Sequence, residues 1–169
     1  MQQTCSTWAP PSSPWQTTVT EPDRPGKYFS WAEMQTTSTG LQNTPTEEAR
    51  ANLYRLVQTV LDPLREELGV PIRVTSGYRS PLVNDAVGGS VTSRHMLGLA
   101  ADIKAKGYNA RQVVDCIDRM YETGRLDYDQ AIAYAVSRGG HVHVGLAPEG
   151  IVPRRQMLWA QDGGGYIAL

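Results

Sequence analysis

The chain has 169 residues, of which 16 are Lys or Arg and 17 are Asp or Glu, so its formal charge is −1. This length corresponds to one ordinary domain, and the balanced charge argues against a nucleic acid held by bulk electrostatics. No apolar run approaches the roughly 18 residues that a membrane span needs. The first residues also lack the basic and apolar regions of a secretory signal, so we expect synthesis in the cytoplasm.

The N-terminal segment differs in composition from the rest of the chain. Residues 1–27 are rich in Pro, Thr, Ser and Gln, a composition that buries little apolar surface. We therefore predict an extended arm over residues 1–27 and one domain over residues 28–169. Trp8 and Trp15 are unusual in such a segment and indicate either that the arm docks on the domain or that it binds a partner.

Three helices are predicted from capping signals and apolar periodicity. A capping box formed by Ser30 and Glu33 begins a short helix. A long helix runs from Thr46 to about Leu68 with its apolar residues on one face, and Pro63 predicts a kink within it. The third helix covers residues 109–123.

Short apolar segments between and after these helices predict strands. The predicted strands are 70–75, 99–103, 129–136 and 140–146. A long polar loop over residues 76–98 separates the first two, a hairpin turn over 137–140 joins the last two, and a Pro- and Gly-rich tail follows. Because most helices precede most strands, we predict an α+β fold with helices packed on a small, mainly antiparallel sheet.

The three histidines of the chain all lie where strands or loops are predicted. His141 and His143 are two residues apart on one strand, so both rings point to the same side. Asp102 follows His95 by seven residues in a buried strand, where a carboxylate needs a partner. One interpretation is a metal site, because two His and one Asp are a standard zinc set that leaves a fourth position for water. The other is a metal-free ion pair between Asp and His.

Several motifs of the chain are similar to those of the M15 zinc peptidases. The elements that carry the resemblance are Ser76-Gly77-Tyr78-Arg79-Ser80-Pro81, Asn84, Val87-Gly88-Gly89-Ser90, Ser93-x-His95-x-x-Gly98-x-Ala100-x-Asp102, Asp129-Gln130 and His143. This family includes D-alanyl-D-alanine carboxypeptidases, dipeptidases and phage endolysins. The resemblance is closest to its short peptidase branch and extends from about Tyr28 to the end of the chain.

The resemblance implies roles for individual residues. His95, Asp102 and His143 match the three zinc ligands, so Zn²⁺ is the expected cofactor. Arg79 matches an arginine expected to bind a substrate carboxylate or the developing oxyanion, although an ion pair that anchors its loop is the alternative. Ser93 is expected to bond near the site or to cap a turn. Gln130 is expected to support the site indirectly, by holding the residues that make direct contacts there.

One departure from the family pattern concerns the general base. Several branches carry Asp or Glu three residues before the last zinc ligand, where this chain has Gly140. His141 is predicted to point to the correct face and can exchange protons near neutral pH. It is therefore our candidate base, with packing or help in metal binding as the alternative. Asp129 and Glu149 are the fallback candidates.

The resemblance to this family also implies a function. We expect a zinc-dependent peptidase that hydrolyses peptidoglycan peptides at a bond involving a D-amino acid, as a carboxypeptidase or an endopeptidase. The alternative is a non-catalytic zinc-containing domain that binds the cell wall or forms part of a virion. The expected place of action is the cell wall, which a phage enzyme reaches by release from the host or inside a virion. No nucleic-acid partner is expected, and the sequence indicates no particular oligomeric state.

Overall fold

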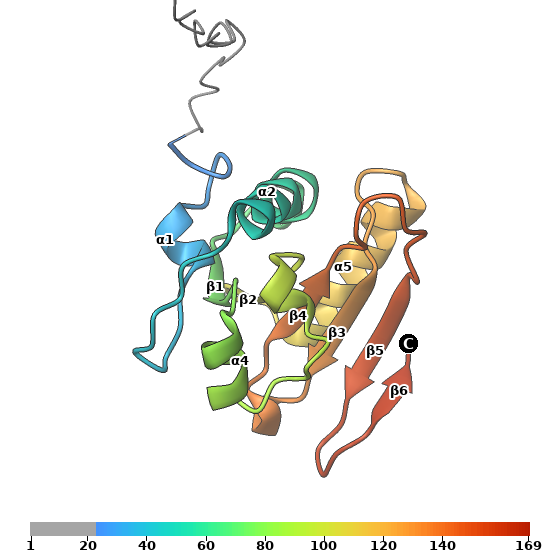
Figure 1. Ribbon diagram of the computed structural model, residues 1–169. Coiled ribbons are helices and arrows are strands. Elements are labelled where there is room, and N and C mark those ends of the chain that lie inside the picture. The colour runs from blue at the N-terminus through green and yellow to red at the C-terminus, as the bar shows by residue number, and fades with distance from the viewer. Residues whose placement is uncertain (1–22) are drawn as a thin grey trace, which may run out of the picture.

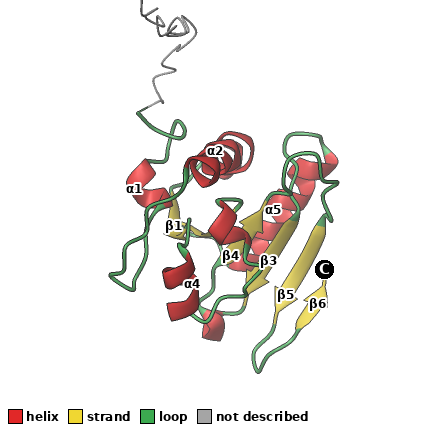
Figure 2. Cartoon of the chain, viewed as in Figure 1, coloured by secondary structure: helices red, strands yellow, loops and turns green. Residues whose placement is uncertain are grey.

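The structure is a computed structural model that describes residues 23–169, so the predicted arm up to residue 22, with Trp8 and Trp15, lies outside the described residues. Figure 1 and Figure 2 show helices packed on one twisted sheet, which confirms the predicted α+β class. The helices are α1 (Trp31–Met34), α2 (Glu47–Leu56), α3 (Asp62–Leu68), α4 (Pro81–Ala86) and α5 (Ala110–Glu122). The strands are β1 (Ile72–Ser76), β2 (Ala100–Ala105), β3 (Gln130–Tyr134), β4 (Val142–Gly145), β5 (Gln156–Ala160) and β6 (Tyr166–Ala168). Three further helical segments are η1 (Val57–Leu61), η2 (Arg94–Leu97) and η3 (Val136–Arg138).

The predicted helix starts are confirmed. At α1 the Glu33 backbone N–H donates to the Ser30 hydroxyl at 3.2 Å, and the Ser30 N–H donates to the Glu33 carboxylate at 2.8 Å. At α2 the Thr46 side chain accepts a hydrogen bond from the Ala49 backbone N–H. Each cap satisfies backbone N–H groups that have no partner within the helix.

The predicted long helix is interrupted before Pro63. A π-helical turn, η1, separates α2 from α3, and the Asp62 N–H bonds to the carbonyl of Val57, five residues back. Proline has no N–H, and its ring clashes with the carbonyl four residues earlier, here that of Thr59. A wider turn relieves this clash, so the effect predicted at Pro63 takes the form of a π turn.

The six strands form one sheet in the order β1-β2-β4-β3-β5-β6. All neighbouring pairs are antiparallel except β3 and β5, which confirms a mainly antiparallel sheet. Alternate strand residues point to one face, where they share an apolar core with α2, α3 and α5. The opposite residues, such as Asp102 on β2 and His143 on β4, therefore point to the other face.

Two segments expected to be irregular contain regular structure. The loop predicted over 76–98 holds α4 and η2. Ser80 caps α4 with Pro81 in its first turn, a helix-start signal that the sequence carried. The C-terminal tail forms β5 and β6, and these strands pair with β3 and with each other. The pairing of β5 with β3 joins segments that are far apart in the sequence, so local patterns do not show it.

The chain that leads into α1 contacts the helical layer. The backbone N–H of Lys27 donates to Asp62 Oδ2 at 2.6 Å, and the Gln58 side chain donates to the Pro25 carbonyl at 2.8 Å. A Cβ at Gly26 would lie only 2.4 Å from Asp62 Oδ2. The last residues of the predicted arm are thus held against α3 and η1. In the described part of the chain, no helix has both the length and the apolar composition that crossing a bilayer requires.

Candidate metal centre

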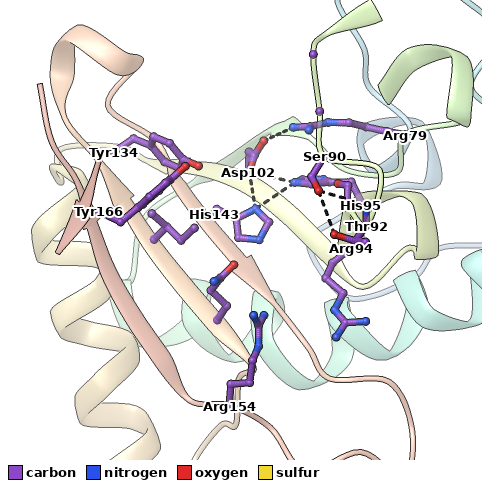
Figure 3. Close-up of a pocket in the computed structure, with 15 residues that line it drawn as sticks. Arg79, Ser90, Thr92, Arg94, His95, Asp102, Tyr134, His143, Arg154 and Tyr166 are labelled. Carbon is purple, nitrogen blue, oxygen red and sulfur yellow. Dashed lines mark hydrogen bonds and ion pairs between the residues drawn. The ribbon is translucent and has the colours of Figure 1, made fainter. Parts of the chain in front are cut away.

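Three elements bring His95, Asp102 and His143 to one point on the open face of the sheet. Asp102 on β2 is paired directly with His143 on β4. His95 belongs to η2, which contacts β2 and ends at Gly98. Gly98 has φ +70°, and a Cβ there would lie 2.1 Å from the Ala49 carbonyl oxygen, so only glycine fits this turn. Figure 3 shows the three side chains turned toward one another.

The three side chains offer ligand atoms in a nearly equilateral triangle. His143 Nδ1 lies 3.0 Å from Asp102 Oδ1, His95 Nε2 lies 3.2 Å from the same oxygen, and the two nitrogens are 3.1 Å apart. Tetrahedral ligands held about 2.0–2.1 Å from an ion are about 3.3–3.4 Å apart. The triangle therefore fits one face of a tetrahedral site, and two His with one Asp suit Zn²⁺.

The hydrogen bonding of His95 supports this interpretation. Its Nδ1 lies 2.7 Å from the Gly77 carbonyl oxygen, which can only accept, so Nδ1 carries the proton in the neutral ring. Nε2 then presents a lone pair to the carboxylate oxygen of Asp102. Because His95 is 2% exposed, burial lowers its pKa and favours this neutral form. Two facing lone pairs repel unless a cation or a proton lies between them, so the arrangement is chemically prepared for a metal ion.

Arg79 fixes the other oxygen of Asp102. Its Nη2 donates to Asp102 Oδ2 at 2.5 Å and its Nε donates to the Ser76 hydroxyl at 2.8 Å. Burial would raise the pKa of Asp102, but its interactions with His95 and His143 hold that pKa well below the usual range. The structure thus contains the ion pair that was the alternative for Arg79, and this pair orients a candidate ligand.

A cavity of about 520 Å³ lies over these residues. Ser93 and Gln130 line it as well, and the Gln130 side chain donates to Gln156 Oε1 at 2.6 Å. Ser93 precedes η2 and makes no capping hydrogen bond through its side chain. The two residues therefore lie at the site, and the hydrogen bond of Gln130 goes to another glutamine.

Sequence reasoning missed several residues of the cavity wall. Among them are Arg94, Tyr134, Arg154 and Tyr166. Arg94 stands directly before His95, and the i, i+2 alternation of β3 places Tyr134 on the face of Gln130, so both carried a signal. Arg154 and Tyr166 belong to the C-terminal tail, whose strands were not predicted, and no local signal was available for them.

The candidate bases differ in their surroundings. The His141 ring stacks on Tyr134, with centroids 4.3 Å apart and an interplanar angle of 16°, and is not among the residues that line the cavity. Burial lowers the pKa of His141. Asp129 is 2% exposed and binds Arg154, so its carboxylate is already engaged. Glu149 is exposed and lines a different pocket, beside Arg55.

Comparison with known proteins gives two findings. The sequence model of the Peptidase M15 family matches residues 27–144, which is more than two thirds of the chain and includes all three candidate ligands. Among curated proteins, the chain is similar to the zinc D-Ala-D-Ala carboxypeptidase of Streptomyces albus G, with 37% identity over 79 residues. This similarity covers 46% of the chain and 31% of the length of that relative.

Proposed function

The chain belongs to the peptidase M15 family, and from this premise we propose that it is a zinc-dependent peptidase of peptidoglycan peptides. The proposed bond involves a D-amino acid, in line with the name of the Streptomyces relative. The observation that carries the proposal is the triangle of His95, Asp102 and His143 ligand atoms at the base of a cavity of about 520 Å³. A cavity of this size accommodates a few residues of a peptide.

His95, Asp102 and His143 hold the metal in this proposal. When bound, Zn²⁺ supplies a Lewis acid that polarises a carbonyl and makes water acidic enough to attack near neutral pH. The chain prepares the ligands for it. The Gly77 carbonyl fixes the tautomer of His95, and Arg79 holds the Asp102 carboxylate in place.

Arg79 also lines the cavity, which supports a second role. A guanidinium has five N–H groups, and its bonds to Ser76 and Asp102 leave several without a partner in those two contacts. We assign these N–H groups to the negative charge that develops on the carbonyl oxygen during attack. Its ion pair with Asp102 keeps the planar group rigid, so little reorganisation is needed.

We assign proton transfer to His141. It stands two residues before His143 in the chain, and its ring is held against Tyr134, which lines the cavity. In this role His141 takes a proton from the attacking water through an intervening water and returns it to the leaving amine. Asp129 does not compete for this role, because Arg154 occupies both its oxygens.

The test is hydrolysis of purified muropeptides by the zinc-loaded protein, followed by mass spectrometry of the products. We expect release of a D-amino acid, or cleavage of a cross-link, and loss of this product in His141→Ala and in Arg79→Gln. Arg111→Gln, on the exposed side of α5, serves as the matched control. Release of no new amine by the zinc-loaded protein would contradict the proposal.

The rival function is a zinc-containing domain that binds the wall or forms part of a virion without catalysis. The observation that favours it is Gly140 at the position of the expected acidic base, with the fallback candidate Asp129 engaged by Arg154. This rival predicts stoichiometric zinc and muropeptide binding with no cleavage. The same mass spectrometry therefore separates the two functions. A phage endolysin is the setting in which we expect the peptidase to reach the wall.

A further inference from the structure

The cavity has a second charged end, formed by Arg94 and Arg154. Figure 3 shows these two side chains close together, on the side of the cavity away from Arg79. Arg94 lies on η2, next to His95, whereas Arg154 lies in the segment before β5. Residue 154 is outside the region 27–144 that matches the family, so part of this end is particular to the C-terminal segment of this chain.

Asp129 is the carboxylate that both arginines approach. Its side chain is only 3% exposed, and Arg154 binds it through Nε at 3.1 Å, Nη2 at 2.6 Å and the backbone N–H at 2.8 Å. The carboxylate is therefore fully satisfied by one arginine. Two positive charges and one negative charge leave this end of the cavity with an excess of one positive charge.

The guanidinium of Arg94 has N–H groups that are available to a ligand. Its Nε lies 3.9 Å from Asp129 Oδ2, beyond hydrogen-bond distance, and within residues 23–169 its guanidinium makes no hydrogen bond. Its side chain is 31% exposed and lines the cavity. By contrast, Arg79 is 17% exposed and engaged with Asp102. A charged group with free donors in a concave site is suited to a planar anion, which a guanidinium binds through two parallel bonds.

We propose that Arg94 and Arg154 form a carboxylate-binding subsite that selects the peptide substrate. The ligand is a free carboxylate of the peptide, either its C-terminal carboxylate or that of an acidic residue. Arg94 supplies the principal donors, and Arg154, held on Asp129, supplies the remaining N–H groups and the electrostatic field. This proposal rests on the proposed peptidase function and refines it: binding of the terminal carboxylate would make the protein a carboxypeptidase, and binding of an acidic residue would define its preferred peptide sequence.

The test compares the zinc-loaded full chain with its Arg94→Gln and Arg94→Lys variants on three peptides. The parent peptide is N-acetylated L-Ala-D-Glu-L-Lys-D-Ala-D-Ala, which has a free carboxylate on D-Glu and another at its C-terminus. One derivative is amidated at the C-terminus and the other at D-Glu. Arg111→Gln removes the same charge on α5, where Arg111 pairs with Asp115, and is the matched control.

We expect amidation of one carboxylate to raise KM about 10- to 100-fold for the unmodified protein, the usual range for a lost charge-assisted hydrogen bond. Arg94→Gln raises KM for the parent peptide by a similar factor and removes the distinction between the peptides, with kcat less affected. Arg94→Lys restores part of the distinction, because it keeps the charge and loses the planar fork. The identity of the sensitive derivative tells whether the terminal or the acidic-residue carboxylate is bound.

Equal sensitivity to amidation in the unmodified protein and in Arg94→Gln would overturn the subsite. So would insensitivity of the unmodified protein to both amidations. If no peptide is hydrolysed, calorimetric binding of the same peptides to the zinc-loaded protein still decides the question. Binding that depends on a carboxylate and on Arg94 then supports the subsite while the peptidase proposal fails. Binding without that dependence overturns both, whereas hydrolysis without that dependence overturns the subsite alone.

Discussion

The two ends of the cavity differ in charge balance and in burial. At the metal end, Asp102 binds Arg79 and faces two histidines, so the charges are matched and the groups are almost fully buried. At the other end, Arg94 and Arg154 share the single carboxylate Asp129, and the Arg154 side chain is 50% exposed. The metal end lies wholly within the segment that matches the family, whereas the other takes Arg154 from beyond it. In our proposals, the reaction chemistry lies within the matched segment, whereas substrate selection combines Arg94 from that segment with Arg154 from beyond it.

The largest effect is expected from Asp102→Asn at the metal end. An amide keeps the shape but removes the anionic ligand, and it leaves Arg79 without its carboxylate. We expect zinc content to fall and activity to drop by at least about 10³-fold, because enzymes accelerate reactions by about 10⁶-fold or more and the metal supplies much of this. Atomic absorption and the muropeptide assay measure the two effects. Asp115→Asn, on exposed α5, is the control, and full zinc occupancy in Asp102→Asn would remove Asp102 from the ligand set.

Substitution of Arg79 is expected to have the next largest effect. Arg79→Gln removes both the orienting ion pair and the proposed oxyanion contact, so we expect a fall in kcat of about 10²- to 10³-fold. Loss of an outer partner of a ligand lowers metal affinity by about 10- to 100-fold. Arg79→Lys separates the roles, since it keeps a charge beside Asp102 but not the planar fork. Zinc titration combined with kcat measures both effects. Unchanged kcat with weakened zinc binding would leave Arg79 as an orienting residue only.

More of the metal end than of the arginine end could be predicted from the sequence, and the reason is physical. The candidate ligands were assigned from the resemblance to the family, whose main element, from Ser93 to Asp102, is local in the sequence. The helix caps at Ser30 and Thr46 were predicted from local patterns as well. The direct pairing of Asp102 with His143 is visible only in the structure. Local patterns report on local contacts.

The rest depended on contacts between distant segments. The parallel pairing of β5 with β3 joins segments more than 20 residues apart through backbone hydrogen bonds, which leave little trace in the side-chain pattern. Arg154 and Tyr166 reach the cavity only because of this pairing. The bond between the Gly77 carbonyl and His95 was equally hidden, because every residue has a carbonyl. The place of His141 as base stays a prediction.

A smaller effect is expected from Tyr166 on β6, which lies on the wall of the cavity and belongs to the C-terminal segment. Tyr166→Ala removes an aromatic surface, and an aromatic contact is worth about 0.5–1.5 kcal/mol, so we expect KM to rise about two- to tenfold. Zinc content stays unchanged, because Tyr166 touches no ligand. Tyr108→Ala, with a similarly exposed ring outside this cavity, is the control. A loss of zinc in Tyr166→Ala would show that the two ends are not independent.

The smallest expected effect is on the free energy of unfolding, to which the ion pair of Asp129 with Arg154 contributes. Burial would raise the pKa of Asp129, but the hydrogen bonds from Arg154 outweigh it and hold that pKa below the usual value. In an unfolded chain the carboxyl has a pKa of about 3.9. The ion pair therefore stabilises the fold fully above about pH 4, and this contribution is lost as the pH falls through the lower folded-state pKa. Asp129→Asn binds no proton in this range, so its free energy of unfolding should decline less steeply with acid than that of the unmodified protein.

Urea unfolding between pH 6 and pH 3 measures this difference. The unmodified protein should be the more stable at pH 6, and the two curves should approach each other at the acid end. Asp102 also has a pKa below its usual range, so the proteins with and without Asp129→Asn are both compared with Asp102→Asn in the background. Parallel curves would show that Asp129 is not held by Arg154 in solution. In that case Arg154 would be free to bind the substrate carboxylate without Asp129.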